Sequence, residues 1–363
     1  MKKIAVLYST VTVVLTLLTA DLYACTGIRT MSSNGDCFRG RTMEFAVYFP
    51  PEVAYIPAGY SYTGTTPDGE TGKQWVSSYS VTGATGFGLP HIIDGINEEG
   101  LTAAVFWFAH YVGYQDWEGS VENTVAPWEF PTWILGSFAS VEEVEAALEQ
   151  ITVAPVSFGE FGFPPPLHYL VMDETGDCIV IEYIEGEPVV YDNPFGVITN
   201  SPSFDWHMTN LKNYVNLSAV NHDPIELSGT TISQMGQGSG LLGMPGDFTP
   251  PSRFIRAVIY SCATPDSNTP DQGVLQSFRL LNQFDIPLGA SMQSQPDSSG
   301  NPVYDYTLWS SVSDLTRRRY YFRTFQDSQI RTIDLSALEG EDFALYPMDG
   351  TTETIEDITG YLR

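Results

Sequence analysis

The chain has 363 residues, long enough to bury a substantial core within one large domain or two ordinary ones. It is strongly acidic, with 44 Asp and Glu residues against 16 Lys and Arg residues and a formal net charge of −28. Such a surface repels phosphate backbones and anionic lipids, so the composition argues against a nucleic-acid partner and against membrane docking through basic residues.

The first 24 residues are typical of a secretory signal peptide. Lys2 and Lys3 precede an apolar run at 4–20, and Ala24 supplies a small residue at the cleavage site. The run is at the lower limit for crossing a bilayer and no basic cluster follows it, which disfavours a stable membrane anchor. We expect cleavage after Ala24, a periplasmic or secreted product, and a single domain at 25–363, because no repeat or low-complexity linker divides it.

Strand patterns come first along the mature chain. Apolar and β-branched residues at 25–32 and 36–45 flank Asn34-Gly35, a dipeptide that strongly indicates a two-residue hairpin turn. The apolar run at 102–110 is typical of a buried strand.

Helices and strands then alternate in blocks. Ser140 and Glu143 form a capping box that predicts a helix at 140–150. The further expected strands lie at 167–173, 178–184, 187–192, 195–200, 317–325 and 329–335, and the further expected helices at 206–214, 252–261 and 273–284. Blocks of antiparallel strands between blocks of helices favour an α+β fold over a doubly wound one.

The cysteines and histidines do not indicate a metal site. Four cysteines and five histidines are present, without the spacings of a zinc site or of a compact disulfide framework. We therefore expect no metal. Whether Cys37, Cys178 or Cys262 form a disulfide is left open by the sequence.

Cys25 has three alternative fates. The junction Leu22-Tyr23-Ala24-Cys25 is similar to a lipobox, whose cysteine would carry lipid, and an exported cysteine can also enter a disulfide. Ordinary cleavage after Ala24 would instead leave Cys25 with a free α-amine. That amine, with an unperturbed pKa of about 7.7 to 8.0, could act as the base for its own thiol, whose reference pKa is about 8.5.

Five segments of the chain, taken together, match one known family. They are Cys25-Thr26-Gly27, Gly40-Arg41-Thr42-Met43-Glu44, GINEEGL at 95–101, VITNSPSFDWHMTNLKNY at 197–214 and GQGSGLLGMPGDFTPPSRFIR at 236–256. In this order they resemble the choloylglycine hydrolase family, which contains penicillin V acylases and bile-salt hydrolases. The resemblance covers most of 25–335 and implies an N-terminal nucleophile hydrolase without a cofactor. It also implies a four-layer αββα sandwich, in agreement with the α+β expectation.

The resemblance also implies roles for individual residues. Cys25 would be the nucleophile and, through its α-amine, the general base. Arg41 would lie beside the sulfur and favour the thiolate, and Arg253 would complete the charged surroundings. Glu44, where many relatives carry Asp, would accept a hydrogen bond from the α-amine. Asn200 would donate its side-chain amide to the oxyanion, with the backbone N–H of Trp107 as the second donor.

The expected substrate is a small N-acyl amide. Trp107 stands where bile-salt hydrolases usually carry Asn and several penicillin V acylases carry Tyr. Its indole would present an aromatic wall to an apolar acyl group, and Phe45, Tyr48 and Phe49 could extend that wall. The leading hypothesis is therefore a penicillin V acylase-like amidohydrolase, with acyl-homoserine lactones as plausible natural substrates.

Two alternatives remain beside this hypothesis. One is hydrolysis of conjugated bile salts. The other is a lipid-anchored binding protein that has the fold but a blocked Cys25. Residues 210–248 also resemble the protruding assembly segment of the family, from which we expect a homotetramer.

Overall fold

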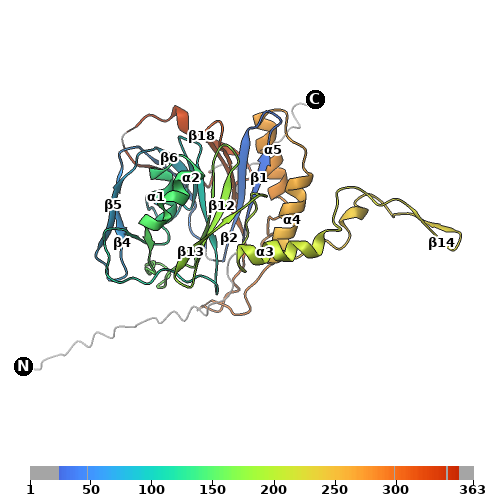
Figure 1. Ribbon diagram of the computed structural model, residues 1–363, viewed down its shortest axis with the longest axis horizontal. Helices are drawn as coiled ribbons and strands as arrows, with labels where there is room; N and C mark the ends of the chain where they lie inside the picture. The colour runs from blue at the N-terminus through green and yellow to red at the C-terminus, as the bar shows by residue number, and fades with distance from the viewer. Residues whose placement is uncertain (1–23, 47, 298, 341, 351–363) are drawn as a thin grey trace, which may run out of the picture.

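The computed structural model describes residues 24–350 except 47, 298 and 341. The expected signal peptide therefore lies outside the described residues, apart from Ala24. Two antiparallel sheets lie against each other in the middle of the molecule, with helices on both outer sides (Figure 1). This is the αββα sandwich that the resemblance implied.

The first sheet has five strands and carries the N-terminal cysteine. Its order is β1 (Cys25–Met31), β2 (Cys37–Phe45), β16 (Tyr306–Asp314), β17 (Arg319–Thr324) and β18 (Arg331–Asp334). β1 and β2 form the predicted hairpin, but its turn has three residues, 33–35, rather than the predicted two: the Ser32 N–H donates to the Asp36 carbonyl oxygen, and only Gly35 of the dipeptide has a positive φ, of 90°. The hairpin register pairs Cys25 with Met43 and Gly27 with Arg41.

The second sheet has eight strands. Its order is β13 (Glu187–Asp192), β12 (Cys178–Ile184), β11 (Leu167–Met172), β8 (Thr102–Trp107), β7 (Asp94–Asn97), β6 (Val81–Thr85), β3 (Glu52–Ile56) and β19 (Ala344–Pro347). Three two-stranded ribbons are formed by β4 (Ser61–Thr65) with β5 (Thr71–Val76), β9 (Thr124–Val125) with β10 (Thr152–Val153), and β14 (Ile225–Leu227) with β15 (Thr230–Ile232).

Helices cover the outer face of each sheet. α4 (Pro250–Ala263) and α5 (Pro270–Leu281) pack on the five-stranded sheet, and α3 (Phe204–Leu211) contacts α4. α1 (Phe130–Ser137) and α2 (Val141–Ala147) share an apolar cluster with the eight-stranded sheet. Short 3₁₀ turns are η1 (Leu148–Gln150), η2 (Lys212–Tyr214), η3 (Ser239–Leu241) and η4 (Leu335–Ala337).

The helix predicted at 140–150 is present, as α2 followed by η1. Ser140 accepts a hydrogen bond from the Glu143 backbone N–H, and the Glu143 carboxylate accepts one from the backbone N–H of Ala139. In a capping box this second bond would come from the backbone N–H of Ser140. Here it comes from Ala139, one residue earlier.

Several segments differ from the sequence prediction, including β3 to β7 and α1, which no sequence pattern predicted; two of the differences bear on the site. Residues 195–200 are an irregular segment rather than a strand, beginning in a turn and ending in a bend, with an isolated bridge between Ile198 and Gly27. β16 was not predicted, because its serines resemble loop composition. Ser311 is fully buried, and its hydroxyl binds the carboxylate of Asp94. A hydroxyl that the sequence pattern assigns to a solvent-exposed loop is thus buried, with its hydrogen bond made to another buried side chain.

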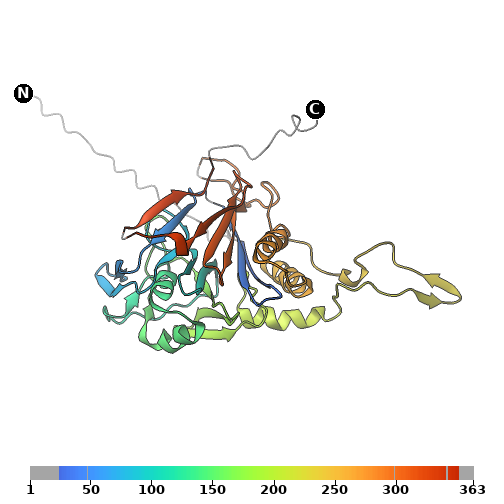
Figure 2. The same cartoon turned by 90° about the horizontal axis from the view of Figure 1, so that it is seen from above.

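An arm formed by residues 215–248 projects from the sandwich beyond α3 and ends near the β14–β15 ribbon (Figure 2). Its apolar side chains include Val215, Leu227 and Met235, which are exposed. The protrusion agrees with the expected assembly segment, and the homotetramer stays a prediction. Within the described part of the chain, no helix has the length and apolar character needed to span a membrane.

Candidate active site

Cys25 lies at the start of β1, buried between the two sheets. Its side chain is 3% exposed, and Sγ lies 3.7 Å from the sulfur of Met43. Burial raises the pKa of the Cys25 thiol above its ordinary value, and the positive charge of Arg41 opposes that rise. All four cysteines are free, so Cys25 is not half of a disulfide in this structure.

Arg41 places a fixed positive charge beside the thiol. Its Nη2 lies 3.1 Å from Cys25 Sγ, and Nη1 donates to the carbonyl oxygen of Val105 over 2.9 Å. The guanidinium also lies over the Phe106 ring, 4.6 Å from its centroid. Val105 and Phe106 belong to β8, so contacts across the two sheets hold Arg41 in place next to Cys25.

Asn200 and Arg253 meet the backbone of Cys25 on its other side. The Cys25 N–H donates to Asn200 Oδ1 over 2.8 Å, and Arg253 Nη2 donates to the same oxygen over 2.7 Å. Arg253 Nη1 donates to the carbonyl oxygen of Cys25 and, over 2.9 Å, to the Thr26 hydroxyl. Segments 175 and 228 residues away in sequence therefore converge on the N-terminal cysteine.

The two oxyanion donors expected from the resemblance lie side by side. Asn200 Nδ2 donates to the carbonyl oxygen of Trp107 over 3.0 Å. The backbone N–H of Phe108 points toward β11 and donates to Pro166. Since successive N–H groups of a strand alternate in direction, that of Trp107 points away from β11.

Glu44 is fully buried next to the residue that precedes the cysteine. Its backbone N–H donates to the carbonyl oxygen of Ala24 over 3.0 Å, and its Oε1 accepts from the Thr307 hydroxyl over 2.8 Å. Oε2 has no hydrogen-bond partner among the described residues. Burial raises the pKa of Glu44 to about 8, and the charge of Arg253 opposes this rise.

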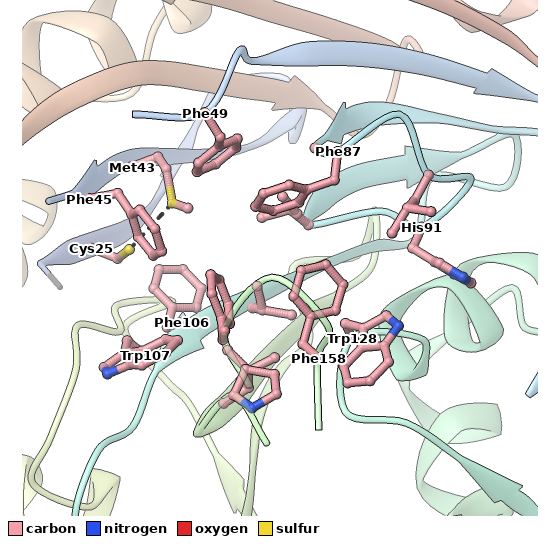
Figure 3. A pocket seen from close by; sticks show the side chains of 17 residues that line it. Cys25, Met43, Phe45, Phe49, Phe87, His91, Phe106, Trp107, Trp128 and Phe158 are labelled. Atoms are coloured by element: carbon pink, nitrogen blue, oxygen red, sulfur yellow. Dashed lines mark hydrogen bonds between the residues drawn. The ribbon is translucent and has the colours of Figure 1, made fainter. Parts of the chain in front are cut away.

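A cavity with almost entirely aromatic and aliphatic walls begins at Cys25. We call it the aromatic cavity. Cys25 lies at one end and Trp128 and His91 at the other (Figure 3). Its other lining residues are Met43, Phe45, Phe49, Gly86, Phe87, Leu89, Ile93, Val105, Phe106, Trp107, Phe158, Phe161, Pro165 and Leu167.

The residues expected to bind substrate lie in two places. Phe45 and Trp107 line the aromatic cavity, with their ring centroids 6.4 Å apart in an edge-to-face contact. Tyr48 is not among the described residues that line this cavity. Its side chain is half exposed, and its hydroxyl donates to Asp349 over 2.7 Å.

Sequence reasoning missed the buried histidines that hold the segment carrying Asn200. His207 Nε2 donates to the carbonyl oxygen of Asn200 over 2.8 Å, and His168 Nε2 donates to that of Thr199 over 3.2 Å. Burial lowers the pKa of His207 to about 4, so the ring is neutral near pH 7. No motif marks these residues in the sequence, because each acts through a backbone carbonyl.

The contact from His207 predicts that it positions Asn200. His207→Phe keeps the ring that stacks on Phe254 but leaves the Asn200 carbonyl without its donor, which should cost about 1–3 kcal/mol of stability. We expect kcat to fall with little change in KM, and His207→Gln, which keeps a donor, to recover most of the activity. Unchanged kcat in His207→Phe would show that Asn200 does not depend on this contact.

A protein-family model of linear amide C–N hydrolases, the choloylglycine hydrolase family, matches residues 25–346. The chain belongs to the choloylglycine hydrolase family. It is therefore a hydrolase of linear amide bonds. Among the described residues, no group of three or more His, Cys, Asp or Glu side chains could hold a metal ion.

Relatives within the choloylglycine hydrolase family include enzymes of two kinds. A bile salt hydrolase/transferase from Clostridium perfringens is 32% identical over 331 residues, covering 90% of this chain and 98% of the relative. A crystal structure of a conjugated bile acid hydrolase variant from the same organism has a TM-score of 0.80 at 31% identity, covering 92% of this chain and 100% of the other. The structure of penicillin V acylase from Agrobacterium tumefaciens has a TM-score of 0.69 at 25% identity, covering 86% and 87%.

Proposed function

We propose that the chain, once residues 1–24 are removed, hydrolyses N-acyl amides whose acyl group is apolar and aromatic, in the manner of a penicillin V acylase. The observation that carries this proposal is the aromatic cavity, which opens directly at the sulfur of Cys25. An aryl or alkyl chain buried there loses only water contacts. A hydroxylated steroid would leave polar groups without partners in this cavity, at a cost of about 1–3 kcal/mol each.

The proposed reaction passes through an acyl-thioester. The α-amine of Cys25 takes the thiol proton, and the thiolate forms a bond to the amide carbonyl carbon. The resulting oxyanion would receive hydrogen bonds from Asn200 Nδ2 and the Trp107 N–H, an arrangement worth about 2.7–4 kcal/mol per donor. The α-ammonium then protonates the departing amine as the C–N bond breaks. Water activated by the same amine cleaves the thioester and releases the acid.

Acyl-homoserine lactones are a second proposed substrate class. Their alkyl chains are apolar, and the aromatic cavity offers them the same apolar walls as it offers an aryl group. We also propose that the protein is exported and that the arm at 215–248 assembles four copies. The signal-peptide pattern of residues 1–24 supports export, and the exposed apolar side chains of the arm support assembly.

Hydrolysis of conjugated bile salts is the competing function. It is favoured by the similarity to the bile salt hydrolase/transferase from Clostridium perfringens, at 32% identity. The two proposals differ in the acyl group, so they can be separated by comparing a phenoxyacetyl amide, a long-chain acyl-homoserine lactone and a glycine-conjugated bile acid. We expect the phenoxyacetyl amide to have the highest kcat/KM and the bile acid the lowest. A preference for the bile acid would contradict the proposal.

The wall of the cavity can be tested by substitution. Trp107→Ala removes the indole but keeps the backbone N–H, so KM for the phenoxyacetyl amide should rise about tenfold, equivalent to 1.4 kcal/mol of lost burial. Trp206→Ala is the matched control, since Trp206 is exposed on α3 and lies outside the described lining of the cavity. Equal effects of the two substitutions would argue against an aromatic acyl site.

A lipid-anchored binding protein is separated from these enzymes by the state of Cys25. Intact-mass measurement of the exported protein should give the mass of residues 25–363 with an unmodified N-terminus. An acylated Cys25 would leave neither the thiol nor the amine for catalysis and would contradict the proposed function.

A further inference from the structure

A second cavity lies on the amine side of the catalytic cysteine. We call it the amine cavity. It has a volume of about 640 Å³ and is lined by Ala24, Asn200 and Arg253, together with Trp107, which also lines the aromatic cavity. Cys25 lines the aromatic cavity, whereas Ala24 and Asn200, which contact its backbone, line the amine cavity, so an acyl group in the first would have its amine directed toward the second.

Asp305 is a buried acid in the wall of the amine cavity. Its side chain is 6% exposed, and Oδ1 has no hydrogen-bond partner among the described residues. Burial raises the pKa of Asp305 to about 7, and the charge of Arg253 opposes the rise. A buried carboxyl oxygen without a donor is costly, and it is the kind of group that a bound ligand can satisfy.

Arg253 is poorly placed to bind an anionic group there. It is the only Lys or Arg among the described residues that line the amine cavity. It donates through Nε to the Phe248 carbonyl oxygen over 2.8 Å, and its two terminal nitrogens are engaged with Cys25, Thr26 and Asn200. Most of its donors are therefore committed within the protein.

The other charged residue in the wall is also acidic. Asp247 holds the start of α4, accepting hydrogen bonds from the Thr249 and Ser252 hydroxyls. A carboxylate or sulfonate on the leaving amine would thus face two acids, with His110 and the largely committed Arg253 as the side chains able to carry a positive charge among the described lining residues. A positively charged group would be attracted by the carboxyl groups of both Asp305 and Asp247.

We propose that the amine cavity selects amides whose leaving amine is neutral or carries an added positive charge, with Asp305 as the residue that contacts the added charge. Amines bearing a carboxylate or sulfonate are discriminated against. This inference rests on the proposed function and narrows it. Penicillin V itself has a carboxylate on its amine side and is expected to react more slowly than a neutral phenoxyacetyl amide.

The test compares three amides of one acid in the mature enzyme. N-phenoxyacetylglycine, N-phenoxyacetylglycinamide and N-phenoxyacetylethylenediamine differ chiefly in the charge of the amine side. We expect kcat/KM for the ethylenediamine derivative to exceed that for the glycine derivative at least about tenfold. Asp305→Asn, which is isosteric, should reduce this ratio about tenfold. Both rates are measured in one sample, so the ratio does not depend on the fraction of folded enzyme.

Glu187→Gln is the matched control, because it removes one negative charge from an exposed position on β13, outside the described lining of the amine cavity. It should leave the ratio unchanged. Three outcomes would overturn the inference but not the proposed function. They are a wild-type preference for the glycine derivative, an equal loss of all three rates in Asp305→Asn, and a shift of the ratio in Glu187→Gln equal to that in Asp305→Asn. Absence of turnover for all three amides would overturn the proposed function and the inference with it.

Discussion

Cys25→Ser is expected to reduce kcat by on the order of 10⁴-fold or more while the protein folds normally. The thiol lies 3.1 Å from Arg41 Nη2, and the backbone N–H of the same residue donates to Asn200 Oδ1, which places the sulfur within the assembled site. A serine hydroxyl keeps the shape but holds its proton much more tightly, so Arg41 and the α-amine cannot supply an equivalent nucleophile.

The control for this substitution is Cys262→Ser on α4, since Cys262 is exposed and lies outside the described lining of the aromatic cavity. It should retain full activity. The measurement is kcat with a phenoxyacetyl amide, together with the unfolding midpoint of each variant. If Cys25→Ser retains activity, the role assigned to the thiol is contradicted. If both variants unfold at the wild-type midpoint, the loss of activity is not caused by a folding defect.

The local part of the site could be predicted from the sequence. Asn34-Gly35 determines the turn between β1 and β2, and the antiparallel register then brings Arg41 back to the level of Gly27, next to the N-terminal cysteine. The short three-residue turn at 33–35 leaves little freedom in the register of its flanking strands. The proximity of Arg41 to Cys25 is thus a consequence of short-range pairing.

The rest of the site depends on packing that sequence patterns do not encode. Asn200 reaches Cys25 from an irregular segment where the sequence pattern predicts a strand, and His207 holds it through a carbonyl oxygen. Asp305 precedes β16, a strand that the sequence does not predict because it is rich in serine. Asp305 lines the amine cavity only because β16 pairs with β2. Contacts between residues so distant in sequence follow from the stacking of the two sheets, which periodicity alone does not specify.

Retention of Ala24 is expected to remove almost all activity, although the thiol is still present. In the structure, Cys25 is still joined to Ala24, and its nitrogen is an amide that donates to Asn200 Oδ1. An amide nitrogen has no basic lone pair, so it can neither accept the thiol proton nor return one to the departing amine. Ala24 also lines the amine cavity, and its carbonyl oxygen accepts from the Glu44 N–H, so it stands where the leaving amine would pass.

The experiment compares two proteins that differ by that residue, one beginning at Cys25 and one beginning at Ala24. We expect the longer protein to lose kcat by on the order of 10³-fold or more, while its thiol is still alkylated after unfolding. Mass measurement before and after the assay verifies that Ala24 is retained. Cleavage thus changes two things at once: it converts an amide into a base, and it clears the amine cavity. If activity is retained with Ala24 intact, another group must serve as the base. Glu44 would then be the next candidate, because its pKa is about 8 and one of its oxygens has no partner among the described residues.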